Sequence, residues 1–148
     1  QALAQFGEEG IRIDFVFTDP HQPSGVALIT VDAHGENTIV VAPGANSTLS
    51  PGHISRAADT IRNSAVCLLQ LEVPVETVLE AAKIAASASQ KVILNPAPAA
   101  ELPAELYPLL FLITPNETEA ELLTGIRIEG MEGAKQAAKA LLAKGVQQ

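Results

Sequence analysis

The 148-residue sequence has no tryptophan, one cysteine and only 3% aromatic residues. A single cysteine excludes a disulfide framework and a cysteine-rich zinc site. Cys67 lies in the apolar run 65–69, where we expect a small buried side chain and not a reactive thiol. No hydrophobic run approaches the roughly 20 residues that span a bilayer, and no signal peptide is visible. We therefore expect a cytoplasmic protein without a membrane partner.

Basic residues are also scarce: nine Lys and Arg face 17 Asp and Glu, and the formal net charge is −8. A surface of this sign repels phosphate backbones, which argues against a nucleic-acid partner. The Walker, GxGxxG, GxSxG and CxxC motifs are missing, so a P-loop or dinucleotide mechanism cannot be placed on this sequence. Ala, Val, Leu and Ile supply most of the hydrophobic content, a composition that suits helices packed on a buried sheet.

Strand and helix patterns alternate through most of the chain. Continuous apolar strands separated by amphipathic helices predict an α/β fold, in which helices cover both faces of a parallel sheet. The strands are expected at 66–71, 92–94 and 110–113, and the helices at 75–86, 116–123 and 131–142, with a further helix that begins at Ser50-Pro51 and reaches Ile61. The chain then divides into 1–10, the end of a core helix; 11–46, a strand and a hairpin; and 47–148, a partial α/β core.

The hairpin is expected to be apolar on both faces. Residues 11–17 predict a first strand, and residues 25–31 and 38–42 predict a hairpin around the polar loop 32–37, in which Gly35 can take a positive φ. Because side chains alternate along a strand, Ala27 and Ile29 share one face while Val26 and Leu28 share the other. We expect the body or a substrate to cover one face and a partner to cover the other.

Polar residues follow each of the three core strands. In open α/β sheets ligands bind beyond the carboxyl ends of the strands, and these ends carry Glu72, Asn95 and the segment 114–119. Glu72 can instead cap the next helix. Asn116 can be an N-cap with Glu119 as its capping-box partner, or the two can organise a hydrated Mg²⁺ or a phosphate, because Mg²⁺ keeps several waters and needs few carboxylates. Both alternatives stay open here.

The segment TPNETEAELLTG (114–125), with its NxxE pattern, closely resembles the ribokinase family of carbohydrate kinases. Further similar blocks occur in the same order along the chain, at 24–29, 35–37, 44–46, 69–72 and 94–98. The resemblance implies a ribokinase-like, Rossmann-type fold in which the hairpin belongs to a small lid. It also implies ATP-dependent phosphorylation of D-ribose at the 5-hydroxyl, with Mg²⁺ and an activating K⁺.

The same resemblance implies roles for individual residues. Glu72 matches a glutamate that hydrogen-bonds a ribose hydroxyl, and three lid positions match residues that cover the apolar face of the sugar: Ala27, Ile29 and Val41. Asn116 and Glu119 match the pair near the ATP phosphates and Mg²⁺, with Glu119 acting on the metal through water. The lid would pair with the lid of a second copy and form a homodimer.

The resemblance also implies what this span lacks. The family's catalytic Asp and its anion hole are expected C-terminal to Gln148, and its other sugar-binding residues in an N-terminal third, so the chain is expected to be an internal piece that is inactive alone. Two alternatives remain. One is a kinase for another sugar or a nucleoside, and the other is a non-catalytic α/β binding or interaction module.

Overall fold

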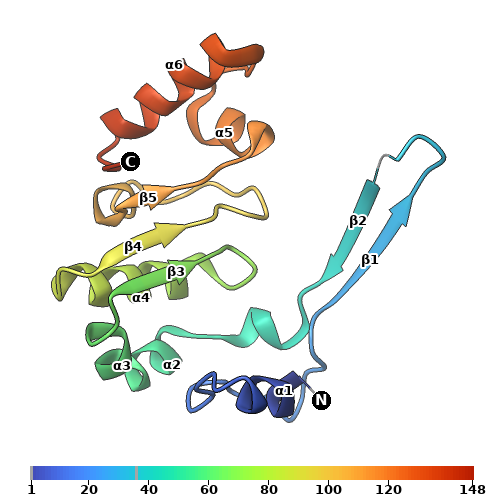
Figure 1. The fold of residues 1–148 in the computed structure, drawn as a ribbon, viewed down its shortest axis with the longest axis vertical. Helices are drawn as coiled ribbons and strands as arrows, with labels where there is room; N and C mark the ends of the chain where they lie inside the picture. Colours follow the sequence, from blue (N-terminus) through green and yellow to red (C-terminus); the bar gives the residue numbers. More distant parts are fainter. Residues whose placement is uncertain (1, 36) are drawn as a thin grey trace.

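The computed structural model describes residues 2–35 and 37–148, which form two separate sheets with helices around one of them (Figure 1). The antiparallel sheet consists of β1 (Val26–Val31) and β2 (Asn37–Ala42), and the parallel sheet of β3 (Val66–Leu69), β4 (Lys91–Leu94) and β5 (Leu112–Ile113), in the order β3-β4-β5. The helices are α1 (Ala2–Glu8), α2 (Pro51–Arg56), α3 (Ala58–Arg62), α4 (Val75–Ser87), α5 (Glu117–Thr124) and α6 (Gly130–Ala143), with 3-10 turns η1 (Gly44–Thr48) and η2 (Tyr107–Leu109). The predicted α/β fold with a parallel sheet and a hairpin is confirmed.

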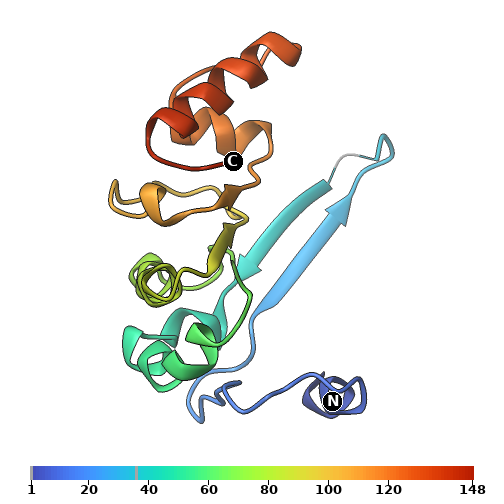
Figure 2. The ribbon, with the colours of Figure 1, turned by 60° about the vertical axis from the view of Figure 1, so that its left-hand side comes forward.

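The hydrophobic core lies between α4 and one face of the parallel sheet. Ala82 and Ala85 of α4 and Val92 and Leu94 of β4 are all fully buried in this layer. Figure 2 shows α4 on one side of the strands and the hairpin on the other. On the hairpin side Leu68 of β3 is 73% exposed, so helix cover at β3 is present on one face only.

The segment 11–17 was predicted to be a strand, and this prediction is wrong. These residues instead contain a turn at positions 14–15, where Arg12 donates to the carboxylate of Asp14 over 2.9 Å. A strand is stable only when its backbone groups are paired, and no described residue forms a ladder with this segment. The preceding helix is present as α1, although none of its residues is buried, so its place in a core remains a prediction.

The helix predicted from Ser50-Pro51 to Ile61 is divided in two. Ala57 leaves the helical conformation, with φ −92° and ψ 2°, and separates α2 from α3. Both short helices pack against α4, and Ala57 and Ala58 are buried at the junction. One helix pattern that is continuous in the sequence therefore forms two short helices in the structure.

The last residues of the chain run beside β5. Gly145, with φ +111°, follows the end of α6. The backbone N–H of Gln147 then donates to the carbonyl of Leu110 over 3.2 Å, and that of Ile113 donates to the carbonyl of Gln148 over 3.1 Å.

Within residues 2–35 and 37–148, no helix combines the length and the hydrophobicity needed to cross a bilayer.

Candidate functional site

The carboxyl ends of the three parallel strands lie side by side and carry the polar segments named from the sequence (Figure 1). The strand ladder continues past the strands themselves: the N–H of Asn95 donates to the carbonyl of Leu69 over 2.9 Å, and that of Thr114 to the carbonyl of Leu94 over 3.0 Å. The loops that carry Glu72, Asn95 and residues 114–119 therefore leave the sheet at one rim.

Glu72 does not cap the helix that follows it. The N-cap of α4 is Pro74, and no side chain bonds to the helix start. Glu72 lies in a bend and is exposed, and no described residue donates to its carboxylate. Its backbone N–H donates to the side-chain oxygen of Gln70 over 2.5 Å. The capping alternative is therefore not supported, and the carboxylate is free to accept hydrogen bonds from a ligand.

Asn116 and Glu119 form a reciprocal capping box at the start of α5. The side-chain oxygen of Asn116 accepts from the N–H of Glu119 over 2.9 Å. In return, the Glu119 carboxylate accepts from the backbone N–H of Asn116 over 2.9 Å and from its side-chain amide over 3.0 Å. Glu119 is only 4% exposed. The capping-box alternative is thus confirmed, and it fixes both side chains before any ligand binds.

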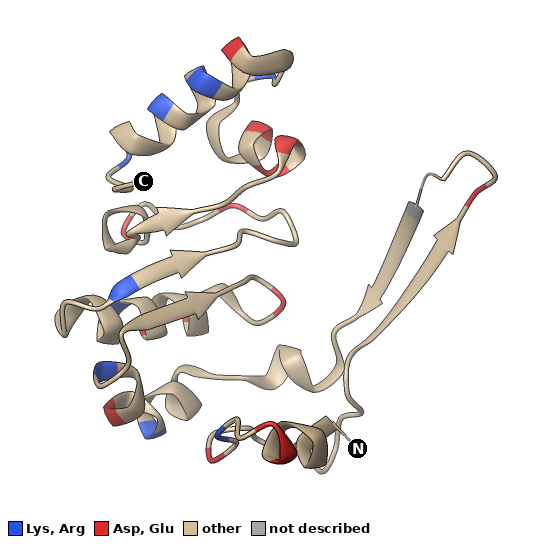
Figure 3. Cartoon of the chain, viewed as in Figure 1, with Lys and Arg blue, Asp and Glu red and all other residues tan. Residues whose placement is uncertain are grey.

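The charge at this rim is acidic. Figure 3 shows acidic residues in the loop after β3 and on α5, and neither segment contains a Lys or Arg. Among residues 2–35 and 37–148, no group of three or more His, Cys, Asp or Glu side chains is arranged to hold a metal ion.

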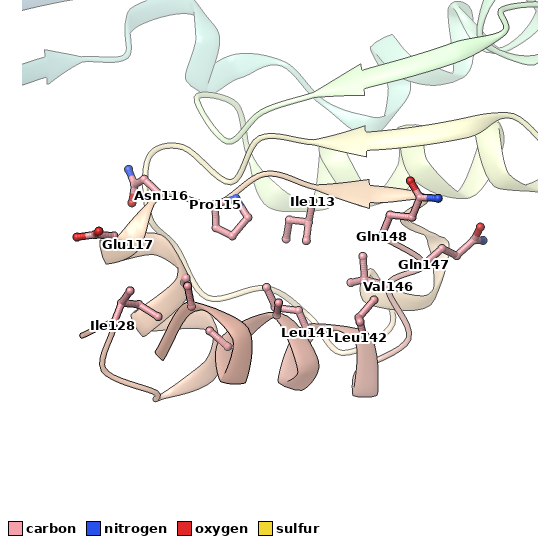
Figure 4. A pocket seen from close by; sticks show the side chains of 14 residues that line it. Ile113, Pro115, Asn116, Glu117, Ile128, Leu141, Leu142, Val146, Gln147 and Gln148 are labelled. Carbon is pink, nitrogen blue, oxygen red and sulfur yellow. The ribbon is translucent and has the colours of Figure 1, made fainter. Parts of the chain in front are cut away.

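A groove of about 430 Å³ lies beside the rim, between β5 and α6 (Figure 4). Asn116 and Glu117 stand at one end and Gln148 at the other, and α6 supplies apolar side chains that include Leu141 and Leu142. No Lys, Arg or His lines it. Most of its lining is apolar, so the groove has the character of a packing surface.

The hairpin brings the three predicted lid residues to one face. In the register of the two strands Ala27 lies opposite Val41, and Ile29 lies opposite Ile39. Residues two apart share a face, so Ile39 completes a set of four, although sequence reasoning did not single it out. The role of Ile39 follows from the pairing register of β1 and β2, which places it directly across from Ile29.

The other face of the hairpin is equally apolar. Val26 is 57% exposed, and the opposed pair Leu28 and Val40 are 67% and 62% exposed. Apart from their pairing with each other, β1 and β2 make no extensive contact with another described element. The loop residue Glu36, part of the predicted polar loop, lies outside the described residues.

A second cleft, of about 510 Å³, lies at the base of the hairpin and was not anticipated from the sequence. Asp19 organises its edge: its carboxylate accepts from the N–H of His21 over 2.8 Å and from the hydroxyl of Thr48 over 2.8 Å. The backbone bond from His21, followed by the bond from Thr48, holds the pKa of Asp19 below its ordinary value. This carboxylate therefore has partners within the fold and ties the segment before β1 to η1.

The family model of pfkB carbohydrate kinases matches residues 1–148, and the chain belongs to this family. It is 43% identical over 142 residues to a ribokinase of Haemophilus influenzae, covering 96% of this chain and 46% of the relative. It is 40% identical over 138 residues to a deoxyribokinase of Salmonella typhi, covering 93% and 45%. The solved structure of Arabidopsis thaliana ribokinase complexed with ribose and ATP matches with a TM-score of 0.81 and 30% identity, covering 94% of this chain and 45% of that one. The chain spans about half the length or less of the curated relatives it matches.

Proposed function

We propose that this chain is part of a longer kinase that transfers the γ-phosphoryl group of ATP to the 5-hydroxyl of D-ribose, giving ribose 5-phosphate. The proposal depends above all on Glu72, whose carboxylate stands at the rim of the sheet with no partner among the described residues. Ribokinases aligned over nearly the whole chain support the sugar and the reaction. In this proposal Glu72 accepts a hydrogen bond from a ribose hydroxyl.

The hairpin supplies the apolar part of the sugar site. Ala27, Ile29 and Val41 share one face and would lie over the carbon side of the sugar. The opposite face, with Leu28 at its centre, would be covered by the lid of a second copy, giving a homodimer. Large exposed apolar surface of this kind typically marks an interaction site. Replacing Leu28 with glutamate is expected to shift the sedimentation of the full-length protein towards the monomer.

Asn116 and Glu119 would act next to the ATP phosphates and Mg²⁺. Each oxygen of the Glu119 carboxylate already accepts one bond from Asn116, but a carboxylate has about four lone-pair sites, so each oxygen can still accept from a metal-bound water. Mg²⁺, when bound, neutralises charge that develops on the phosphates, which this acidic rim cannot do. K⁺ is expected as a second, activating cation.

The base for the sugar hydroxyl is proposed to lie outside these residues. Phosphoryl transfer needs a base for the sugar hydroxyl and groups that stabilise spreading charge, and the rim described here supplies neither. A catalytic Asp and an anion hole are proposed C-terminal to Gln148, in a cytoplasmic enzyme, and the 148 residues alone are expected to be inactive.

The test is ADP release with ATP, Mg²⁺ and K⁺, comparing D-ribose, deoxyribose, fructose and adenosine. The full-length protein is expected to turn over with ribose, and Glu72→Ala to raise the KM for ribose on the order of tenfold to a hundredfold, the effect of losing a bond to a charged group. Turnover by the 148-residue chain would contradict the placement of the catalytic Asp.

One other sugar has specific support. A deoxyribokinase is as similar to this chain as some of the ribokinases are. A higher kcat/KM for deoxyribose than for ribose would favour that substrate. Ligand binding without turnover in the full-length protein would instead favour the non-catalytic module.

A further inference from the structure

Gln70 holds the loop that carries Glu72. β3 ends at Leu69, and residues 71–73 form a bend in which no regular ladder continues. The side-chain oxygen of Gln70, which is half-buried, accepts the backbone N–H of Glu72 over 2.5 Å. No other described residue accepts from this N–H. The conformation at Glu72 therefore depends on the Gln70 side chain.

The residue between them is fixed from the other side. The N–H of Leu71 donates to the carbonyl of Ala97 over 2.8 Å, in the loop that follows β4, and Leu71 is only 7% exposed in the core. The bend is thus held at two successive N–H groups, one by the neighbouring loop and one by Gln70. Leu71 would stay in place if the Gln70 bond were lost, whereas the backbone at Glu72 would be released.

The carboxylate of Glu72 has no partner of its own to orient it among the described residues. Its direction is set by the backbone from which it projects. We propose that Gln70 is a positioning residue for the sugar site: its amide oxygen orients Glu72 towards a polyol hydroxyl without touching the sugar. This inference rests on the proposed function, because it deepens the role given there to Glu72.

The central variant is Gln70→Leu in the full-length protein, which keeps the size of the side chain and removes the acceptor. A net hydrogen bond corresponds to roughly a threefold to tenfold change in an equilibrium constant, so the KM for ribose is expected to rise by about that factor, with kcat and the KM for ATP close to those of the wild type. Gln70→Glu retains an oxygen at the same position and is expected to restore most of the ribose affinity.

Gln90 provides a control: it directly precedes β4, at the end of the sheet opposite the rim. Its side-chain amide donates to the carbonyl of Arg62 over 2.9 Å, so here too a glutamine side chain bonds to the backbone, although as a donor and away from the rim. Gln90→Leu is expected to lower the thermal midpoint as Gln70→Leu does, and to leave the KM for ribose unchanged. Equal KM values in the two leucine variants would refute the positioning role.

A double-mutant cycle separates positioning from general damage. If Gln70 acts through Glu72, then Gln70→Leu adds no further loss of ribose binding in a Glu72→Ala background, as calorimetry can measure. An undiminished additional loss would overturn the inference. If Gln70→Leu does not fold, Gln70→Met serves the same comparison, since it also lacks the acceptor. Absence of ribose turnover in the wild type would instead contradict the proposed function and is a separate outcome.

Discussion

Replacing Glu119 with glutamine exchanges only one carboxylate oxygen for an NH₂ group, yet it should disrupt the capping box at the start of α5. Both carboxylate oxygens accept from donors on Asn116, one from the backbone and one from the side-chain amide. A glutamine has one oxygen and one NH₂ group. Its oxygen must face the backbone N–H, so its NH₂ would face the NH₂ of Asn116. Rotating the Asn116 amide only moves the conflict, because its NH₂ would then face the N–H of residue 119.

The expected cost follows from this conflict. One bond of three is lost and a donor in a nearly buried site is left without an acceptor, which typically costs about 1–3 kcal/mol. The lost negative charge in the first turn of α5 adds about 0.3–1 kcal/mol. Glu117→Gln is the matched control, since Glu117 is exposed in the same turn. It should show only the smaller, charge-related part.

Urea unfolding of the full-length protein measures these differences. The decisive variant is Asn116→Asp combined with Glu119→Gln, because an aspartate accepts from both the N–H of residue 119 and the new NH₂. All three bonds and the charge are then restored, and stability should return to within about 0.5 kcal/mol of the wild type, the usual error of additive comparisons. The reasoning is refuted if Glu119→Gln is no less stable than Glu117→Gln, or if the double variant gives no recovery. A stable double variant that lacks kinase activity would show that the Glu119 carboxylate has a role beyond capping.

Three further predictions concern the rest of the fold. Leu94→Ala, at a fully buried position of β4, should lower the free energy of unfolding by about 2–5 kcal/mol in urea titration. Burial raises the pKa of the Cys67 thiol above its ordinary value of 9.0. The stability linked to the neutral thiol is therefore present below that value and is lost as pH rises through the folded pKa. As a check, Cys67 should react with iodoacetamide more slowly in the native protein than in urea. Gly44 has φ +53°, and a Cβ added there would meet the backbone of Pro23 and Ser24. Gly44→Ala should therefore destabilise the closed base of the hairpin by about 1–3 kcal/mol. The effect can be measured as faster proteolysis between residues 20 and 45.

The parts of the fold that the sequence predicts well are those specified by neighbouring residues. The capping box of Asn116 and Glu119 and the left-handed Gly125 mark both ends of α5 within the sequence itself. Helix α4 follows from its apolar period alone. The strand expected at 11–17 failed because a strand also needs a partner, and alternation in one segment carries no information about its neighbour.

Other features of the site depend on tertiary contacts. The turn at Ala57 divides a helix pattern that is continuous in the sequence into two short helices, both of which pack on α4. The N–H of Glu72 bonds to the side chain of Gln70, only two residues away. The sequence does not predict this bond, because a glutamine beside a strand end can adopt many other rotamers. Ile39 joins the lid face only once the register opposite Ile29 is known. Residue types therefore indicated the rim and the lid, while the atoms that orient them required the structure.

The two halves of the proposed sugar site are held in different ways. The loop with Glu72 is bonded to the neighbouring loop through Leu71 and Ala97 and to Gln70 beside it. The hairpin makes no extensive contact with the described core, and its own base is closed by the N–H of Ala45, which donates to the carbonyl of Pro23 over 2.8 Å. A perturbation of the first half should therefore change the affinity for the sugar hydroxyls locally. A perturbation at the base, such as Gly44→Ala, should instead change how the whole apolar face meets the rim, so its effect on ribose affinity should persist when Glu72 is replaced.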